Sequence, residues 1–157
     1  MLKLPLLVVG RGATGELRQG AASNIRFIDA VSDQDLAQHL SRCKALIFPG
    51  VEDFGIVPVE AMASGRPVIA YARGGALETV IHGKTGILFY EQSARALAEA
   101  VIQLESGKFS FEPYALREFA AKFDRSRFSQ RISDFIFERI AESKGEKKRM
   151  NDALPHP

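Results

Sequence analysis

Two acidic residues lie eight positions apart in one short segment, on either side of a predicted helix start. Glu52 follows a predicted strand, and Glu60 lies one turn into the helix predicted next. Carboxylates accept hydrogen bonds from vicinal hydroxyl groups, such as those of ribose or a hexose. Between the acids, the sequence DFGIVP brings a glycine and several backbone N–H groups to a helix N-terminus, which suits a phosphate or a hydroxyl group. The segment therefore indicates a nucleotide-sugar site.

The same acids also fit a simpler interpretation. Glu52 would then be a solvated loop residue, and Glu60 an ordinary first-turn acid favoured by the helix dipole. If only the two acids are considered, this simpler interpretation is favoured. The residues around them must therefore distinguish it from a nucleotide-sugar site. One neighbour, Arg73, follows a predicted strand beside Gly74 and could either reach a phosphate or remain a solvated arginine.

A separate glycine-rich segment has the pattern of a dinucleotide-binding turn. Gly10, Gly12 and Gly15 spell G-x-G-x-x-G after an apolar run, and Asp29 follows near the position of a ribose-binding acid. Between Gly15 and the next predicted strand at Asn24, there is room for only about two helical turns. We therefore expect a tight strand-to-helix turn here, and we keep an NAD-binding domain only as a third interpretation.

The elements that must position these residues alternate between strand and helix. Apolar runs predict five strands at 4–9, 24–28, 45–49, 67–71 and 85–90. Periodic stretches predict helices at 16–22, 33–43, 58–63, 76–81 and 94–104, and then two C-terminal helices at 113–123 and 125–143. Such alternation predicts a Rossmann-like α/β fold, a parallel sheet with helices on both faces. Ligands of such sheets bind beyond the carboxyl ends of the strands, which here include the loops 49–57 and 90–93.

Composition excludes several other classes of protein. The chain has 157 residues, 46% of them apolar and 25% charged, as in a soluble globular domain. Its net charge of +2 resides in the C-terminal tail, so nothing points to nucleic acid. The single cysteine, Cys43, excludes a disulfide framework. No apolar run approaches the length of a transmembrane helix, and we expect a cytoplasmic protein that could attach peripherally to a membrane when assembled.

The central segment EDFGIVPVEAMASGRPVIAYARGGALETVIHGKTGILF closely resembles the group 1 (family 4) retaining glycosyltransferases. Shared features are Glu-x7-Glu with Phe-Gly after the first acid, Glu-Ala-Met-Ala, a Gly-Gly-x-x-Glu turn and a Thr-Gly strand start. The variants EDFGIVPVEAMA and ARGGALETV look most like mannosyltransferases of O-antigen and exopolysaccharide assembly. The resemblance runs from about residue 5 to residue 137 and implies the carboxyl-terminal, donor-binding domain of a GT-B fold.

The resemblance also implies roles for individual residues. Glu52 would contact the hydroxyl groups of the donor sugar and stabilise the transition state, and Glu60 would bind the ribose. Backbone N–H groups would bind the sugar and the diphosphate, namely those of Phe54, Gly55, Ile56 and Val57, with Arg73 and Gly74 beside them. The base pocket of the nucleotide would be formed by Phe27, Ile28 and Val31. Such enzymes need no metal or other cofactor, because helix ends and basic side chains neutralise the leaving diphosphate.

The chain departs from the family pattern in three ways. The sequence shows no counterpart of the amino-terminal acceptor domain. Its first predicted strand aligns better with the second strand of the family's carboxyl-terminal domain, so we expect the family's first strand, and the Arg/Lys pair that binds the diphosphate there, to be missing. That strand would lie in the centre of a 3-2-1-4-5-6 sheet. We therefore expect the first and third strands of this chain to pair directly, or the sheet to be rearranged or completed by a partner. Asp29 stands where the family usually has Gly, which weakens the predicted base pocket.

Our first interpretation is the donor-binding part of a retaining glycosyltransferase that transfers a hexose, specifically mannose, in polysaccharide or lipopolysaccharide assembly. Residues 1–143 would form this incomplete domain, and residues 144–157 would be a disordered tail. We expect no activity without an amino-terminal glycosyltransferase domain, with that domain or a second copy of the chain as partner. The alternative is a catalytically inactive binding or assembly module that keeps the nucleotide-sugar fold.

Overall fold

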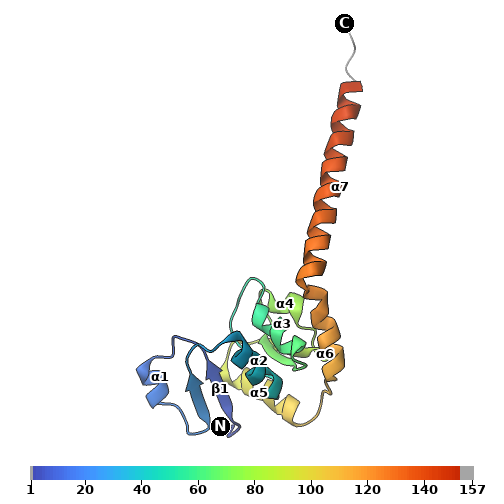
Figure 1. Cartoon of the computed structure of the whole chain (residues 1–157). Helices are drawn as coiled ribbons and strands as arrows, with labels where there is room; N and C mark the ends of the chain where they lie inside the picture. Colours follow the sequence, from blue (N-terminus) through green and yellow to red (C-terminus); the bar gives the residue numbers. More distant parts are fainter. Residues whose placement is uncertain (1, 153–157) are drawn as a thin grey trace. The chain divides into compact units, whose positions relative to one another are not determined.

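A computed structural model describes residues 2–152, with side chains described up to residue 143 (Figure 1). The chain divides into two compact units, Met1–Ala120 and Ala121–Pro157. The last long helix belongs to the second unit, and the expected domain of residues 1–143 stays a prediction.

The first unit alternates strands and helices in the expected order. Its strands are β1 (Leu6–Val9), β2 (Ile25–Ile28), β3 (Leu46–Phe48), β4 (Val68–Tyr71) and β5 (Gly86–Phe89). Its helices are α1 (Gly15–Gln19), α2 (Asp33–Arg42), α3 (Ile56–Ala63), α4 (Ala76–Thr79), α5 (Ala94–Glu105) and α6 (Pro113–Ala120). Every described strand pair is parallel. These features confirm the Rossmann-like α/β class.

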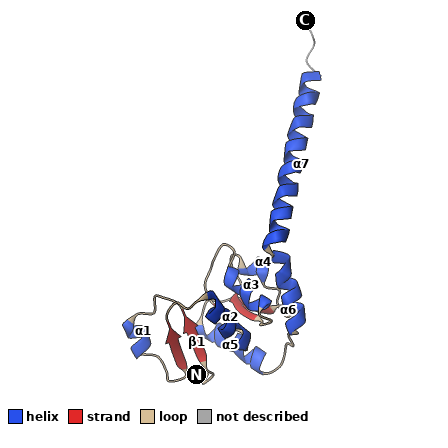
Figure 2. Cartoon of the chain, viewed as in Figure 1, coloured by secondary structure: helices blue, strands red, loops and turns tan. Residues whose placement is uncertain are grey.

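The five described strands form two sheets, which Figure 2 shows as two groups of red arrows. One sheet pairs β1 with β2, and the other has the order β3-β4-β5. Leu6 lies opposite Ile25 in the first sheet, and Val68 lies opposite both Leu46 and Gly86 in the second. Among the described residues, β1 does not pair with β3, so the expected direct pairing of the first and third strands is not observed. The split leaves the other two alternatives, a rearranged sheet and a sheet completed by a partner, as predictions.

The hydrophobic core lies on both faces of the three-stranded sheet. Because successive side chains of a strand point to opposite faces, Val68 and Ala70 of β4 belong to one cluster and Ile69 to another. The first cluster contains Met62 of α3 and Leu116 of α6, whereas the second is closed by α5. A sheet covered on both faces fixes the carboxyl ends of β3 and β4, from which the candidate site is built.

The two-stranded sheet is much less buried. No residue of β1 or β2 is buried, and Leu6 and Leu7 are 36% and 38% exposed. A two-stranded sheet has little stability of its own, since it needs a further strand or a packed face. The two-stranded sheet is therefore expected to be the least stable part of the first unit.

The second unit consists of a short 3-10 turn, Ala121–Phe123, and the long helix α7 (Arg125–Asp152). The predicted helix at 125–143 is present, but it continues to Asp152 in a region expected to be disordered, and residues 153–157 lie outside the described residues. The helical period of α7 puts Phe128 and Phe135 on one apolar face, and these side chains are 65% and 52% exposed. A helical period alone identifies an apolar face without showing what covers it.

Asp124 caps the start of α7, and this predicts a pH effect. The backbone N–H of Ser126 donates to Asp124 Oδ1 at 2.8 Å, and hydrogen bonds from the hydroxyl and the N–H of Ser126 lower the pKa of the Asp124 carboxyl. A lowered pKa gives the helix stability above the unfolded pKa of about 3.9 and removes it as the pH falls through the folded pKa. We expect the helical circular dichroism of α7 to fall over this acidic range.

The control for this prediction is Asp124→Asn, which keeps a capping side chain but cannot titrate. The variant is expected to remain helical at neutral pH and to lose the acid-dependent step contributed by Asp124. An unchanged acid titration in Asp124→Asn would show that the cap does not produce it.

Candidate functional site

The loop after β3 leads directly into α3 and leaves the N-terminus of that helix open. Gly55 precedes α3 with φ +75°, and no side chain caps the helix. The first N–H groups of a helix have no partner within it, so those of Gly55, Ile56 and Val57 can receive a ligand. Pro58 has no N–H to leave unpaired and suits the first turn. The predicted helix is present, but it begins at Ile56 rather than at Pro58.

Buried apolar residues hold α3 in place beneath this open end. Pro58, Ala61 and Met62 are buried, whereas Glu60 faces solvent. The ring of Phe48, the last residue of β3, lies close to Gly55, since a Cβ on Gly55 would be 3.1 Å from Phe48 Cζ. The backbone donors are therefore carried by a packed helix rather than by a free loop.

The turn after β4 contacts the loop after β3 at backbone distance. The N–H of Gly75 donates to the carbonyl oxygen of Glu52 at 2.7 Å. A Cβ on Gly75 would lie 2.4 Å from the Cα of Phe54, and one on Gly74 would lie 2.5 Å from the Glu52 carbonyl oxygen. Only glycines allow such an approach. The structure therefore brings Glu52, Phe54, Gly55 and Gly74 together, as the sequence predicted for one site.

The charged side chains of this site point into solvent. Glu52, Glu60 and Arg73 are exposed. Within the described part of the chain, none of these three side chains forms an ion pair or a side-chain hydrogen bond. The two carboxylates can thus accept hydrogen bonds from a polar ligand, and the guanidinium can donate hydrogen bonds to it.

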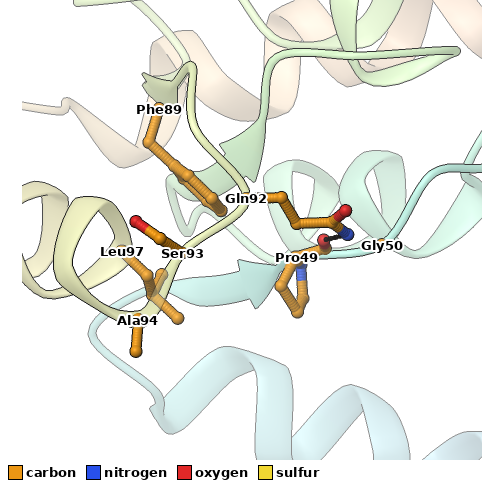
Figure 3. Close-up of a pocket in the computed structure, with 7 residues that line it drawn as sticks. All are labelled: Pro49, Gly50, Phe89, Gln92, Ser93, Ala94 and Leu97. Carbon is orange, nitrogen blue, oxygen red and sulfur yellow. Dashed lines mark hydrogen bonds between the residues drawn. The ribbon is translucent and has the colours of Figure 1, made fainter.

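A pocket of about 430 Å³ lies beyond the carboxyl ends of β3 and β5 (Figure 3). It is lined by Pro49, Gly50, Phe89, Gln92, Ser93, Ala94 and Leu97. The Gln92 side-chain amide donates to the Pro49 carbonyl oxygen at 3.1 Å and ties the two loops together. The sequence pointed to the loops 49–57 and 90–93, but it predicted none of the lining residues as site residues, because no motif marks them. Neither Glu52 nor Glu60 lines this pocket.

The residues predicted for the base pocket lie in the other sheet. Phe27 and Ile28 end β2, Val31 follows it, and all three are half-buried. Arg18 reaches Asp29 with an N···O distance of 2.6 Å, and its guanidinium lies 5.6 Å from the centre of the Phe27 ring. An ion pair thus occupies the surroundings of Phe27, and the base pocket stays a prediction.

The G-x-G-x-x-G segment forms the expected tight turn. Gly10 and Gly12 have φ values of +133° and +119°, which favour glycine, and Gly15 begins α1. The helix α1 has five residues and is capped by the side chain of Thr14. Such a short helix lacks the length of a helix that carries a pyrophosphate site.

Residues 4–123 match the family model described as "Glycosyl transferases group 1". The chain belongs to this family. The match covers both sheets, the loops that carry Glu52 and Gly74, and the helix α3 that carries Glu60. The resemblance seen in the sequence is therefore confirmed.

Several curated members of the family are similar to this chain. The Alpha-1,3/1,6-mannosyltransferase ALG2 of Dictyostelium discoideum is 34% identical over 61% of this chain and 27% of its own length. The Phosphatidyl-myo-inositol mannosyltransferase of Mycobacterium leprae is 33% identical over 88% of this chain and 38% of its own length. This group 1 chain thus spans well under half the length of these relatives.

Solved glycosyltransferase structures of the GT-B class share the fold. HepE of Anabaena, in complex with UDP-glucose, has a TM-score of 0.72 and 27% identity, over 85% of this chain and 41% of its own. Sucrose-phosphate synthase from Thermosynechococcus elongatus has a TM-score of 0.73 and 29% identity, over 87% of this chain and 39% of its own. In the part of the group 1 chain that is described, no helix is both long and apolar enough to span a membrane.

Proposed function

We propose that this chain is the donor-binding part of a retaining glycosyltransferase that uses a nucleotide-diphosphate hexose. The observation that carries the proposal is the backbone junction between Glu52 and Gly75 beside the open N-terminus of α3. The junction fixes the backbone of Glu52 in the loop that leads to α3, and a carboxylate together with unpaired N–H donors would supply the groups that a sugar diphosphate requires. The complex of the similar HepE protein with UDP-glucose supports a nucleotide sugar as the ligand class.

Each group then has a chemical task. The N–H groups of Gly55, Ile56 and Val57, together with the positive end of the α3 dipole, receive the diphosphate. Glu60 accepts hydrogen bonds from the ribose, and Glu52 accepts them from the donor hexose and stabilises the developing positive charge. The backbone N–H of Phe54 and the Gly74 turn complete the site, while Arg73 supplies a positive charge for the phosphates. No metal is part of this proposal.

Mannose is the hexose we propose, because both curated relatives described above are mannosyltransferases. Polysaccharide or lipopolysaccharide assembly in the cytoplasm is the proposed setting. Transfer to an acceptor further requires an acceptor-binding domain, supplied by an amino-terminal glycosyltransferase domain or a second copy of the chain. We therefore expect donor binding without turnover from these 157 residues alone.

The second candidate function is a nucleotide-sugar-fold module that takes part in assembly without catalysis. The ion pair of Arg18 with Asp29 favours it, since the Arg18 guanidinium lies 5.6 Å from the centre of the Phe27 ring, where the base is predicted to bind. Donor affinity separates the two candidates, because the inactive module has no need to retain the ligand.

Isothermal titration of the chain with GDP-mannose, UDP-glucose, ADP-glucose and NAD tests the proposal. We expect GDP-mannose to bind, and Glu60→Gln to weaken it at least about tenfold, since a charge-assisted hydrogen bond contributes about 1.5–3 kcal/mol. Glu118→Gln is the matched control, because Glu118 is an exposed acid on α6, and it should bind as the parent does.

Three results of this titration would count against us. No binding of any nucleotide sugar at millimolar concentration would favour the non-catalytic module. Equal affinity of the parent and Glu60→Gln would remove Glu60 from the ribose site. Tight binding of NAD would restore the dinucleotide interpretation of the glycine-rich turn.

A further inference from the structure

The loop that carries Glu52 is tied to neighbouring segments at two points. The N–H of Gly75 donates to the Glu52 carbonyl oxygen at 2.7 Å, and the side-chain amide of Gln92 donates to the Pro49 carbonyl oxygen at 3.1 Å. The first bond joins two backbones, so it does not depend on the type of any side chain. The second bond depends on one side chain, that of Gln92, which lies in the loop after β5.

The partner of Gln92 determines how its amide group is turned. A carbonyl oxygen can only accept a hydrogen bond, so the amide nitrogen, rather than the amide oxygen, must face Pro49. Figure 3 shows this nitrogen directed at the Pro49 oxygen. A residue that replaces Gln92 therefore has to donate a hydrogen bond over the same length to keep the two loops joined.

The backbone of Gln92 is held by the start of α5. The next residue, Ser93, caps this helix by accepting a hydrogen bond from the Ala96 N–H at 3.2 Å, and the Ser93 N–H donates to the Glu91 carbonyl oxygen at 2.7 Å. Further along α5, Ala100 is 2% exposed and packs in the hydrophobic core. The amide of Gln92 is thus carried by a segment whose backbone is fixed.

The Pro49 side of this bond has less support from packing. Pro49 and Gly50 border the pocket of about 430 Å³, so open space lies beside this part of the loop. Residues 49–54 are all exposed. A segment with few buried contacts opens easily, so a single hydrogen bond has a large share in fixing its conformation.

The position of Pro49 in the loop links its hydrogen bond to Glu52. Buried residues fix both ends of the loop, Phe48 at the end of β3 and Gly55 before α3. Between these ends, Pro49 lies only three residues before Glu52. Loss of the bond from Gln92 would therefore release the first half of the loop and let the Glu52 carboxylate move relative to the N–H groups of α3.

We propose that Gln92 is a positioning residue of the donor site, and that its amide holds the Glu52 loop in the conformation that receives the nucleotide sugar. This role rests on the proposed function, because donor binding is what the ordered loop serves. It adds to the site the loop after β5, which contributes no ligand-binding group to that function. An ordered loop binds its ligand more tightly, since less conformational freedom is lost on binding.

NMR relaxation of the chain without ligand tests whether Gln92 orders the loop. The variants are Gln92→Leu and Gln92→Glu, which have side chains of similar size but no donor at neutral pH. In both, we expect the backbone order parameters of residues 50–53 to fall from about 0.85 to below about 0.6, and those of α5 to stay unchanged. Unchanged order parameters would overturn the proposal. A change in one variant only would also overturn it, because both variants lack the bond.

Isothermal titration with GDP-mannose measures the consequence for the donor site. We expect Gln92→Leu to lower the affinity about fivefold, the loss that corresponds to one neutral hydrogen bond. The matched control is Gln38→Leu, an exposed glutamine on α2, which should bind as the parent does. Parent-like affinity in Gln92→Leu, or an equal loss in the control, would overturn the proposal. No binding by the parent would instead contradict the proposed function, and the order parameters would then decide alone whether Gln92 holds the loop.

A double-mutant cycle with Glu52→Gln distinguishes positioning from a merely structural role. Independent residues give affinity losses that multiply, whereas residues that act through one loop are coupled. We expect the loss caused by Gln92→Leu to shrink from about fivefold to below about twofold in the Glu52→Gln background, because the position of the loop matters less once its carboxylate is gone. Losses that multiply would overturn the proposal, since Gln92 would then act independently of Glu52.

Discussion

The variant Gly75→Ala is expected to lose GDP-mannose binding by at least about 100-fold. Its Cβ would lie 2.4 Å from both Cα and the carbonyl oxygen of Phe54 and 2.5 Å from the carbonyl oxygen of Asp53. Because all three atoms belong to the backbone, no rotamer change relieves the overlap, and the loop after β3 has to move. Loss of two charge-assisted hydrogen bonds to the ligand, at about 1.5 kcal/mol each, would lower the affinity about 100-fold.

The measurement for Gly75→Ala is isothermal titration with GDP-mannose, accompanied by thermal unfolding. We expect the fold to survive with a loss of about 1–3 kcal/mol, typical of overpacking, because the displaced loop is exposed. The control is Gly15→Ala, where an added Cβ meets no atom within 4 Å. It also destroys the G-x-G-x-x-G pattern, so unchanged donor affinity in this control would separate the donor site from the dinucleotide-like turn. Parent-like affinity in Gly75→Ala would show that the Glu52–Gly75 junction is not part of the donor site.

The variant Gly86→Ala should act on the fold itself. Gly86 begins β5 opposite Val68 of β4, and an added Cβ would lie 2.0 Å from the Val68 carbonyl oxygen and 2.8 Å from Val80 Cγ1. Both neighbours are fully buried, so relief requires β4 and β5 to separate. We expect the free energy of unfolding to fall by about 3 kcal/mol or more, at the upper end of overpacking effects.

Urea unfolding at 25 °C measures this loss, and soluble expression gives a second readout where the variant does not fold. The matched control is Ile87→Val, which removes one methylene from the next, 1% exposed residue of β5. That change should cost about 0.5–1.5 kcal/mol, the usual range for this truncation. A loss below about 1 kcal/mol in Gly86→Ala would mean that β5 can shift against β4 without disturbing the core.

Features set by local sequence could be predicted. Ser32 caps α2 with its hydroxyl oxygen 3.1 Å from the Asp35 N–H, as expected for a serine before a periodic stretch. The five strands occur where apolar runs indicated them, and the short space after Gly15 limits α1 to five residues. Glu52 and Glu60 lie on either side of an open helix start because Gly55 and Pro58 determine that start locally.

Features set by contacts between distant segments could not be predicted in the same way. The approach of Gly75 to Phe54 depends on the spacing of β3 and β4, and the sequence showed only a Gly-Gly pair. The bond of Gln92 to Pro49 likewise joins loops 43 residues apart. The separation of β1 from β3 and the exposure of Phe128 depend on which apolar surfaces pack against another element. Hydrophobic periodicity identifies such surfaces but does not show what they pack against.

The junction of Glu52 with Gly75 also limits how this site can diverge among homologous proteins. Backbone atoms fill the space beside both glycines of the turn, so a larger residue at Gly74 or Gly75 cannot be accepted without rebuilding the loop. Diversification is left to side chains that project outward, such as those of Asp53 and Arg73. A descendant of this chain could therefore change the specificity of the proposed donor site through its exposed residues, while the backbone frame of that site would be inherited unchanged.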